Sequence, residues 1–241
     1  RDQLFISRIK SDYLAEHFKV YALDLKGFGY SSKLLDEDYT VDGYADFVKS
    51  FMDKLEIKNA SLAGNSMGGA ISLAMCLKYP HYVNKLILIN SAGFLGKTWI
   101  SKIIRRKLFI SSVRPFVGKR LSKMILNLLC YNKKIITDHI VEEYIKPYRQ
   151  KNTLKTFFLA TKAVLDKTLL YRIKEIQHPC LIIWGIHDKV IPLKNAKRFH
   201  KEIKNSQLEL LEDCGHLPQE ESPEKVNQLI RIFKDKSFPN A

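Results

Sequence analysis

The chain has 241 residues, of which 46% are hydrophobic and 11% aromatic. This composition excludes an intrinsically disordered chain and is sufficient for one large core, alone or with an inserted subdomain. The 40 Lys and Arg against 25 Asp and Glu give a formal net charge of +15, which by itself favours nucleic acid, an anionic membrane or an acidic substrate as partner. No stretch approaches the roughly 18 apolar residues of a membrane span.

The positive charge is concentrated in one part of the chain. Residues 97–165 contain 16 Lys and Arg but three acidic residues, whereas the remainder holds 24 bases and 22 acids. A basic segment on a nearly neutral body indicates either a module with its own surface role or lysines that merely solvate helix faces. Both interpretations stay open. The segment has no nucleic-acid-reading motif, so we expect no nucleic-acid partner.

The four cysteines are far apart in the sequence. Their positions (Cys76, Cys130, Cys180 and Cys214) fit neither a disulfide scaffold nor the spacing of a zinc site. We therefore expect no metal and a reducing compartment such as the cytoplasm, with a membrane-peripheral position as the alternative if the basic segment binds lipid.

Apolar runs of strand length alternate with segments of helical periodicity along most of the chain. The predicted strands cover residues 17–25, 60–64, 83–90, 179–185 and 208–212. The predicted helices cover residues 41–55, 67–78, 193–202 and 223–234. This alternation predicts an α/β fold with a mostly parallel sheet flanked by helices.

Residues 95–176 break the alternation. They contain several amphipathic helical patterns and no convincing strand, and they hold nearly all of the basic segment. The sequence thus predicts an all-helical insertion at 95–176 between a first core part, 1–94, and a second core part, 177–241.

The strongest chemical motif is the G-x-S-x-G pentapeptide at residues 64–68, between a predicted strand and a predicted helix. In that context Ser66 lies at a sharp turn that exposes its Oγ to a substrate. The helix that begins at Met67 directs its positive end toward the site, and the Met67 N–H is placed to stabilise an oxyanion. The alternative is a glycine-rich strand–helix turn with an incidental serine.

A serine hydroxyl needs a base to accept its proton and a carboxylate to orient that base. Asp188 and His216 occur downstream, each in a loop after a predicted strand. Because the carboxyl ends of parallel strands meet at one edge of a sheet, we expect Ser66, Asp188 and His216 to come together there.

With these residues in place, the sequence resembles the α/β-hydrolase superfamily. Four stretches carry the resemblance: DLKGFGYS at 24–31, GNSMGG at 64–69, WGIHDKVIP at 184–192 and GHLPQEESPEKV at 215–226. The resemblance implies Ser66 as nucleophile, His216 as base and then acid, and Asp188 as the residue that orients His216. It also implies that the helical insertion is a cap, or lid, over the substrate pocket.

Within that superfamily, GNSMGG and the 28-residue step from Asp188 to His216 are similar to carbon–carbon bond hydrolases of ring-cleavage products. Those enzymes usually have Trp after the histidine, where this chain has Leu217. Epoxide hydrolases and haloalkane dehalogenases share the body and cap but use an aspartate nucleophile, which Ser66 argues against. We expect Asn65 and Leu217 to contact substrate, and the resemblance implies no metal or organic cofactor.

The family has another strand and an oxyanion loop before the 24–31 motif. Here residues 1–16 are predicted to be the tail of that loop and the following helix, so the strand between the 17–25 and 60–64 strands would be missing. We therefore expect an N-terminally incomplete stretch of a longer protein, without the loop that supplies the second oxyanion donor.

Together these features predict a serine hydrolase that cleaves an ester or carbon–carbon ketone bond in a small, largely apolar carbonyl substrate. Two alternatives remain at this stage. One is a non-catalytic ligand-binding protein on the same body. The other is a lipid hydrolase that docks on an anionic membrane surface through its basic lid.

Overall fold

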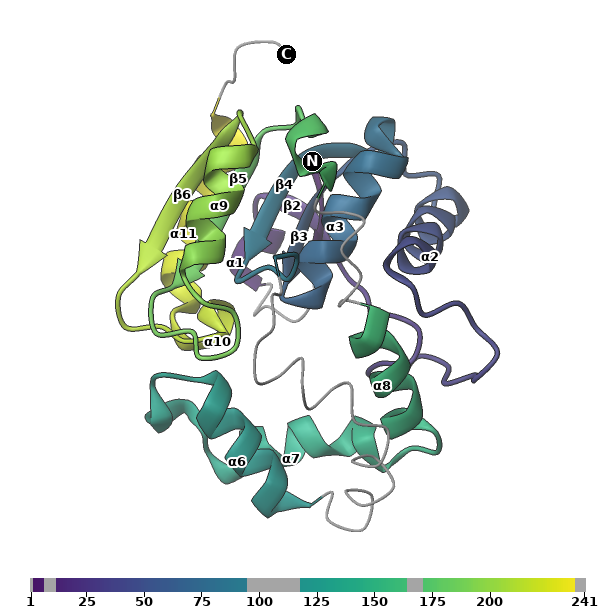
Figure 1. Cartoon of the computed structure of the whole chain (residues 1–241), viewed down its shortest axis with the longest axis vertical. Helices are drawn as coiled ribbons and strands as arrows, with labels where there is room; N and C mark the ends of the chain where they lie inside the picture. The colour runs from purple at the N-terminus through teal and green to yellow at the C-terminus, as the bar shows by residue number, and fades with distance from the viewer. Residues whose placement is uncertain (1, 7–11, 95–117, 164–170, 237–241) are drawn as a thin grey trace.

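The computed structural model describes residues 2–6, 12–94, 118–163 and 171–236, and within them a six-stranded sheet forms the centre of the molecule (Figure 1). All its neighbouring strands pair in parallel, in the order β2-β1-β3-β4-β5-β6. The α/β fold with a parallel sheet is thereby confirmed. The strands are β1 (Asp2–Ile6), β2 (Phe18–Ala22), β3 (Ala60–Asn65), β4 (Val83–Ile89), β5 (Cys180–Gly185) and β6 (Ser206–Leu211).

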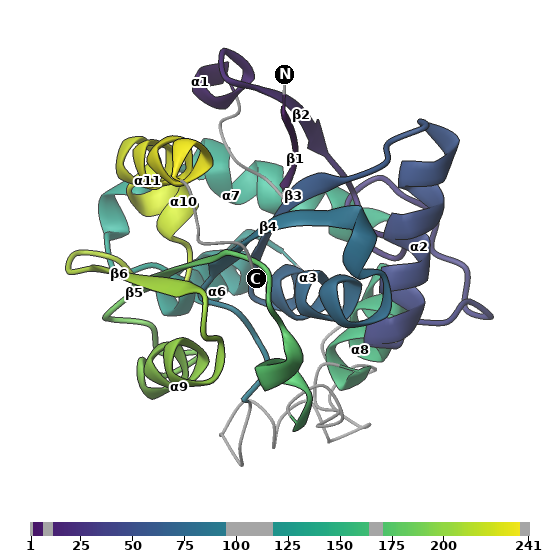
Figure 2. The same ribbon diagram turned by 90° about the horizontal axis from the view of Figure 1, so that it is seen from above.

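Helices cover both faces of the sheet, as the view from above shows (Figure 2). One face carries α2 (Val41–Lys54), α3 (Met67–Lys78) and α9 (Lys194–Glu202), and the other carries α1 (Asp12–Ala15) and α11 (Pro223–Asp235). Strand β4 shows how helices on both faces stabilise the sheet. Its Leu86 and Leu88 pack in one core cluster, and its Ile87 and Ile89 pack in the cluster on the opposite face. A parallel strand buried on both faces has no polar side, which explains the apolar run at residues 86–89.

The structure corrects one expectation about the N-terminal residues. Asp2–Ile6 forms β1, which pairs with β2 on one side and β3 on the other, at the position expected to be missing. The expectation that residues 1–16 are only a loop tail and a helix is therefore wrong. The physical reason is that β2 and β3 each present a row of backbone hydrogen-bonding groups, and the Asp2–Ile6 backbone satisfies both rows.

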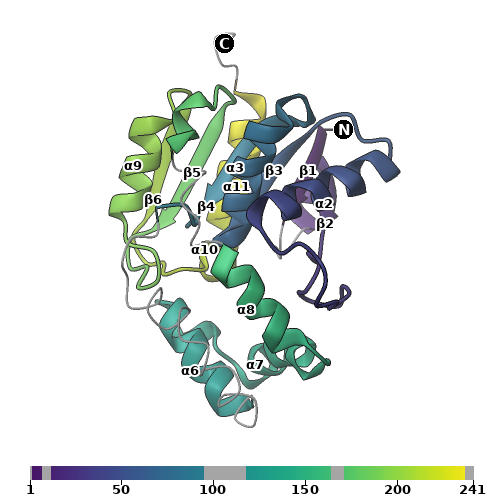
Figure 3. The same ribbon diagram turned by 45° about the vertical axis from the view of Figure 1, so that its right-hand side comes forward.

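The described part of residues 95–176 contains helices and no strand. It comprises α6 (Lys119–Leu129), α7 (Asp138–Ile145) and α8 (Thr153–Ala163), which lie beyond the carboxyl ends of the strands (Figures 1 and 3). Short 3₁₀ turns occur here and elsewhere, at Pro80–Tyr82, Lys133–Ile135, Lys146–Arg149 and Ile173–Glu175. The layer formed by α6, α7 and α8 is called the helical layer below.

The first attachment of the helical layer to the body is at α8. Thr156 Oγ1 donates a hydrogen bond to the Gly27 carbonyl at 2.9 Å, and Asn152 Nδ2 donates to the Lys33 carbonyl at 3.2 Å. Gly27 has φ +82°, and a Cβ there would lie 3.0 Å from Thr156 Cβ. The glycine in the 24–31 motif therefore permits both the turn and the close approach of α8.

The charge of the helical layer is unbalanced on its surface. The three acidic residues of segment 97–165 all form ion pairs with bases of the same segment, namely Asp138 with Lys123, Glu142 with Lys119 and Arg149, and Glu143 with Lys146. Further exposed bases include Arg120, Lys134, Lys151 and Lys155. Among the described residues, no helix has both the length and the apolar character that crossing a membrane requires.

Candidate active site

Ser66 lies at a sharp turn between β3 and α3. Its backbone adopts φ 53° and ψ −116°, a conformation that non-glycine residues rarely take and that stores strain. The turn requires small neighbours, because a Cβ on Gly64 would lie 2.2 Å from the carbonyl carbon of Gly68. On the next turn, a Cβ on Gly69 would lie 2.2 Å from Ser91 Oγ. The spacing of these glycines is thus explained by the close packing that the turn needs.

Backbone hydrogen bonds fix the Ser66 turn against β4 and the segment that follows it. The Ser66 N–H donates to the Ile89 carbonyl at 3.0 Å, and the Ala92 N–H donates to the Ser66 carbonyl at 2.8 Å. Ser66 itself is half-buried. A turn held on both its N–H and its C=O can keep a strained conformation, since the surroundings determine it.

The Asn65 side chain joins this turn to the His216 loop. Its Nδ2 donates to the His216 carbonyl at 2.9 Å and to the Ile89 carbonyl at 3.1 Å. Both amide hydrogens are therefore used to hold the backbone, which leaves the Oδ1 atom for a ligand. Substrate contact by Asn65 stays a prediction, and the structure adds a positioning role.

Met67 is the first residue of α3, so its N–H belongs to the first helical turn, where N–H groups have no intrahelical acceptor. This location meets the requirement for an oxyanion donor next to Ser66. The loop that supplies the second donor in the family was expected to be missing from this chain. Residues 7–11, between β1 and α1, lie outside the described residues, and the expectation about this loop stays a prediction.

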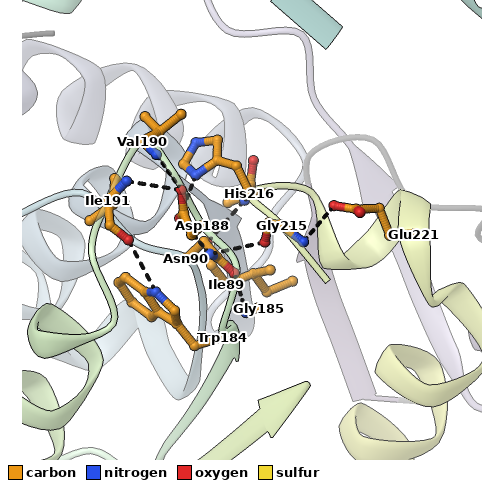
Figure 4. A network of polar contacts seen from close by, with 11 residues as sticks. Ile89, Asn90, Trp184, Gly185, Asp188, Val190, Ile191, Gly215, His216 and Glu221 are labelled. Carbon is orange, nitrogen blue, oxygen red and sulfur yellow. Dashed lines mark hydrogen bonds and ion pairs between the residues drawn. The ribbon is translucent and has the colours of Figure 1, made fainter. Parts of the chain in front are cut away.

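The structure brings Asp188 and His216 together at the carboxyl ends of β5 and β6. His216 Nδ1 lies 2.8 Å from Asp188 Oδ2, and the two side chains are only 5% and 0% exposed (Figure 4). In the tautomer whose Nδ1–H donates to Asp188, the ring presents a lone pair on Nε2 that can accept a proton. No hydrogen bond joins Ser66 Oγ to the His216 ring among the described residues.

The Asp188 carboxylate has further donors. The N–H groups of Val190 and Ile191 donate to its Oδ1 at 2.7 and 2.9 Å (Figure 4). Charge-assisted hydrogen bonds of this kind stabilise a buried carboxylate and fix its orientation. The orientation of the Asp188 carboxylate is therefore fixed independently of its contact with His216.

Asn90, directly after β4, is a residue that the sequence prediction missed. It is fully buried with φ 42°, and its Nδ2 donates to Asp188 Oδ2 at 2.5 Å and to the Gly215 carbonyl at 3.3 Å. Its Oδ1 accepts the Gly185 N–H at 3.0 Å. One amide thus connects the ends of β4 and β5 and the His216 loop (Figure 4). The available signal was an amide at the end of an otherwise apolar strand.

Leu217, the other predicted substrate contact, is buried between the body and the helical layer. It belongs to an apolar cluster with Leu126, Cys130, Val141 and Ile145. The residue after His216 therefore packs against α6 and α7, which places the helical layer next to the proposed base. Contact with a substrate stays a prediction for Leu217.

The cysteines near the site are not suited to act as nucleophiles. Burial raises the pKa of Cys130 to about 12. Burial also raises the pKa of Cys214, and a contact with Ser222 Oγ only partly offsets this effect. Because the thiolate is the reactive form of cysteine, both thiols stay neutral and unreactive near neutral pH. The hydroxyl of Ser66 is the better nucleophile candidate at this edge of the sheet.

Comparisons with known proteins agree with the fold. The model of the alpha/beta hydrolase fold family matches residues 5–223. An uncharacterised hydrolase, YugF of Bacillus subtilis, is 30% identical over 223 residues, which are 91% of this chain and 81% of that protein. A 2-hydroxymuconate semialdehyde hydrolase of a Pseudomonas species is 28% identical over 233 residues, with 94% and 80% of the two chains covered.

Solved structures show the same architecture. The structure of a meta-cleavage product hydrolase from Pseudomonas fluorescens superimposes with a TM-score of 0.83 and 23% identity, covering 98% of this chain and 90% of that one. At this identity the likeness concerns the fold. The match of the family model over most of the chain establishes more: this protein belongs to the alpha/beta hydrolase fold family.

Proposed function

We propose that this hydrolase uses Ser66, His216 and Asp188 as a catalytic triad to cleave an ester or a carbon–carbon ketone bond. The observation that carries the proposal is the buried 2.8 Å contact between His216 Nδ1 and Asp188 Oδ2, at the same sheet edge as the strained Ser66 turn. Asn65 links the two parts, because its side chain bonds the His216 carbonyl while its backbone leads into Ser66.

In the proposed reaction, Ser66 Oγ attacks the substrate carbonyl carbon while His216 Nε2 takes the hydroxyl proton. Asp188 holds the ring and stabilises the imidazolium that forms. The Met67 N–H stabilises the oxyanion of the tetrahedral intermediate. His216 then gives its proton to the leaving group and activates the water that releases the acyl product.

The substrate class is proposed to be a small, largely apolar carbonyl compound. Similarity to a 2-hydroxymuconate semialdehyde hydrolase, whose named substrate carries an aldehyde carbonyl, supports the carbon–carbon branch of the proposal, and the triad chemistry supports an ester equally. For the ketone, an alternative route has Ser66 assist a water molecule that adds to the carbonyl as a gem-diol. Both routes need the same three side chains.

Replacement of Ser66 tests the proposal. We expect Ser66→Ala to abolish hydrolysis of short p-nitrophenyl esters and vinylogous diketones, and to prevent labelling by a fluorophosphonate probe. Ser206→Ala, at the amino end of β6, is the control and should retain both properties. Unchanged activity in Ser66→Ala would show that Ser66 is not the nucleophile. If the wild-type protein binds ligands but is not labelled, a non-catalytic binding function replaces the proposal.

A second candidate function is hydrolysis of lipid-like substrates at an anionic membrane surface. The observation that favours it is on α6, where Met124 and Ile125 are 63% and 44% exposed on the same helix as exposed Arg120 and Lys123. Each base close to an anionic surface contributes about 1 kcal/mol of binding. Co-sedimentation with vesicles should increase with the fraction of phosphatidylserine, and equal binding to neutral vesicles would exclude this candidate.

A further inference from the structure

The C-terminal end of α6 lies directly against the loop that carries His216. The segment Leu129–Asn132 is called the α6 end below. The His216 N–H donates to the Leu129 carbonyl at 2.7 Å. A Cβ on Gly215 would lie 2.5 Å from the Leu129 oxygen and 2.7 Å from the Tyr131 nitrogen. The backbones therefore approach so closely that a displacement of one displaces the other.

A buried carboxylate joins the same two segments. Glu221, at the end of α10 (Pro218–Glu221), is 8% exposed. Its Oε2 accepts the N–H groups of Tyr131 and Asn132 at 2.6 and 2.8 Å, and its Oε1 accepts the Gly215 N–H at 2.9 Å (Figure 4 shows the last of these). No ion pair includes Glu221 among the described residues. Backbone N–H groups alone therefore compensate its charge in the described part of the chain.

The α6 end also contacts the loop of the proposed acid. The ring of Tyr131 stacks on the ring of His187, with centroids 3.9 Å apart and planes inclined by 10°. His187 precedes Asp188, and its N–H donates to the Cys214 carbonyl at 3.0 Å. One short segment of the helical layer thus touches the loops of both His216 and Asp188.

From these contacts we infer that Glu221 is a positioning residue. It fixes the position of His216 and makes that position depend on the packing of the α6 end against the His216 loop. The inference rests on the proposed function, because it takes His216 as the base. Glu221 does not touch the reacting atoms; it acts through the Gly215 backbone. While the α6 end packs against the His216 loop, Glu221 Oε2 accepts two N–H groups of the α6 end and Oε1 accepts the N–H of Gly215, the residue before His216. When the α6 end lifts, the carboxylate loses two of its three donors and the His216 N–H loses its acceptor.

The variant Glu221→Gln tests this, because it keeps the shape but replaces one acceptor oxygen with an NH₂ group that faces a backbone N–H. We expect kcat for a short p-nitrophenyl ester to fall about 10- to 100-fold, as a displaced catalytic group predicts. KM should change less than about twofold, because the substrate contacts remain. The rate of fluorophosphonate labelling of Ser66 should fall with kcat. Glu224→Gln, an exposed neighbour on α11, is the control and should match the wild type.

Each outcome decides for or against the inference. A folded Glu221→Gln protein with wild-type kcat and labelling rate overturns it, and so does a change confined to KM. Absence of labelling in the wild-type protein instead overturns the proposed triad. If Glu221→Gln does not fold, hydrogen exchange of the wild-type protein decides: peptides with residues 129–132 and 215–216 should open together. Independent, faster exchange of residues 129–132 overturns the coupling.

Discussion

Asn90 gives the sharpest test of how the site is held. The substitution Asn90→Ala removes an amide that is fully buried and forms three hydrogen bonds, one of them to the Asp188 carboxylate at 2.5 Å. It leaves the Gly185 N–H and the Gly215 carbonyl without their partner. It also places alanine at φ 42°, a backbone region that asparagine tolerates better.

The expected loss of stability follows from these contacts. A hydrogen bond to a charged group contributes about 1.5–3 kcal/mol, and an unsatisfied buried donor costs about 1–3 kcal/mol. Because the two effects overlap at one side chain, we expect the free energy of unfolding to fall by about 3–5 kcal/mol. This is a large part of the roughly 5–15 kcal/mol that stabilises a typical protein. The Asp188 carboxylate also becomes less fixed, so kcat should fall more than KM rises.

The assay is urea denaturation followed by circular dichroism, together with ester kinetics on the folded protein. Asn152→Ala is a matched control, since Asn152 also has a positive φ, 67°, but donates one bond to a neutral carbonyl, that of Lys33. We expect this control to lose about 1–2 kcal/mol, from one neutral bond and the backbone strain. Equal losses in the two variants, with kcat unchanged in Asn90→Ala, would refute the reasoning.

Three further predictions concern the Ser66 turn and the buried thiols. Ser66→Gly relieves the positive φ, so it should be more stable than Ser66→Ala by about 1 kcal/mol in urea titrations; equal stabilities would contradict the strain. Gly64→Ala places a Cβ 2.2 Å from a backbone carbon, so it should lose about 1–3 kcal/mol and most ester activity, and wild-type kinetics would contradict that. Burial raises the pKa of Cys76 and Cys180, so above about pH 8.5 their thiols ionise in the unfolded chain but not in the folded one. The free energy of unfolding should therefore fall as the pH rises, by up to about 1.4 kcal/mol per pH unit for each thiol. Cys180→Ala should make this slope shallower, and an unchanged slope would contradict the assignment.

The elements with strong local patterns were predictable from the sequence. The apolar run of β4 and the helical periodicity of α2 end within one residue of their predicted limits. Strand β1 was missed because a five-residue strand has little pattern of its own, and its place depends on pairing with Ser61 and its neighbours, far along the chain. The helix α10 was also missed, because four residues are too few to show a helical pattern.

The sequence predicted those features of the site that depend only on which residues follow each strand. Because parallel strands end at one edge, the approach of Asp188 and His216 followed from their places after β5 and β6. The supporting residues did not follow. Asn90 binds Asp188, 98 positions away, and Glu221 joins the nearby Gly215 to Tyr131, which is 90 positions away. Such contacts depend on how loops and the helical layer meet, and no local pattern encodes that.

The two attachments of the helical layer differ in the charge of their polar contacts, and this has a consequence for mutation. At α8 the polar contacts are neutral, a hydroxyl and an amide on the carbonyls of Gly27 and Lys33. At the α6 end a carboxylate, that of Glu221, accepts two N–H groups. Charge-assisted bonds are about twice as strong as neutral ones, so removal of the Glu221 carboxylate costs more per polar contact than removal of the Thr156 hydroxyl or the Asn152 amide.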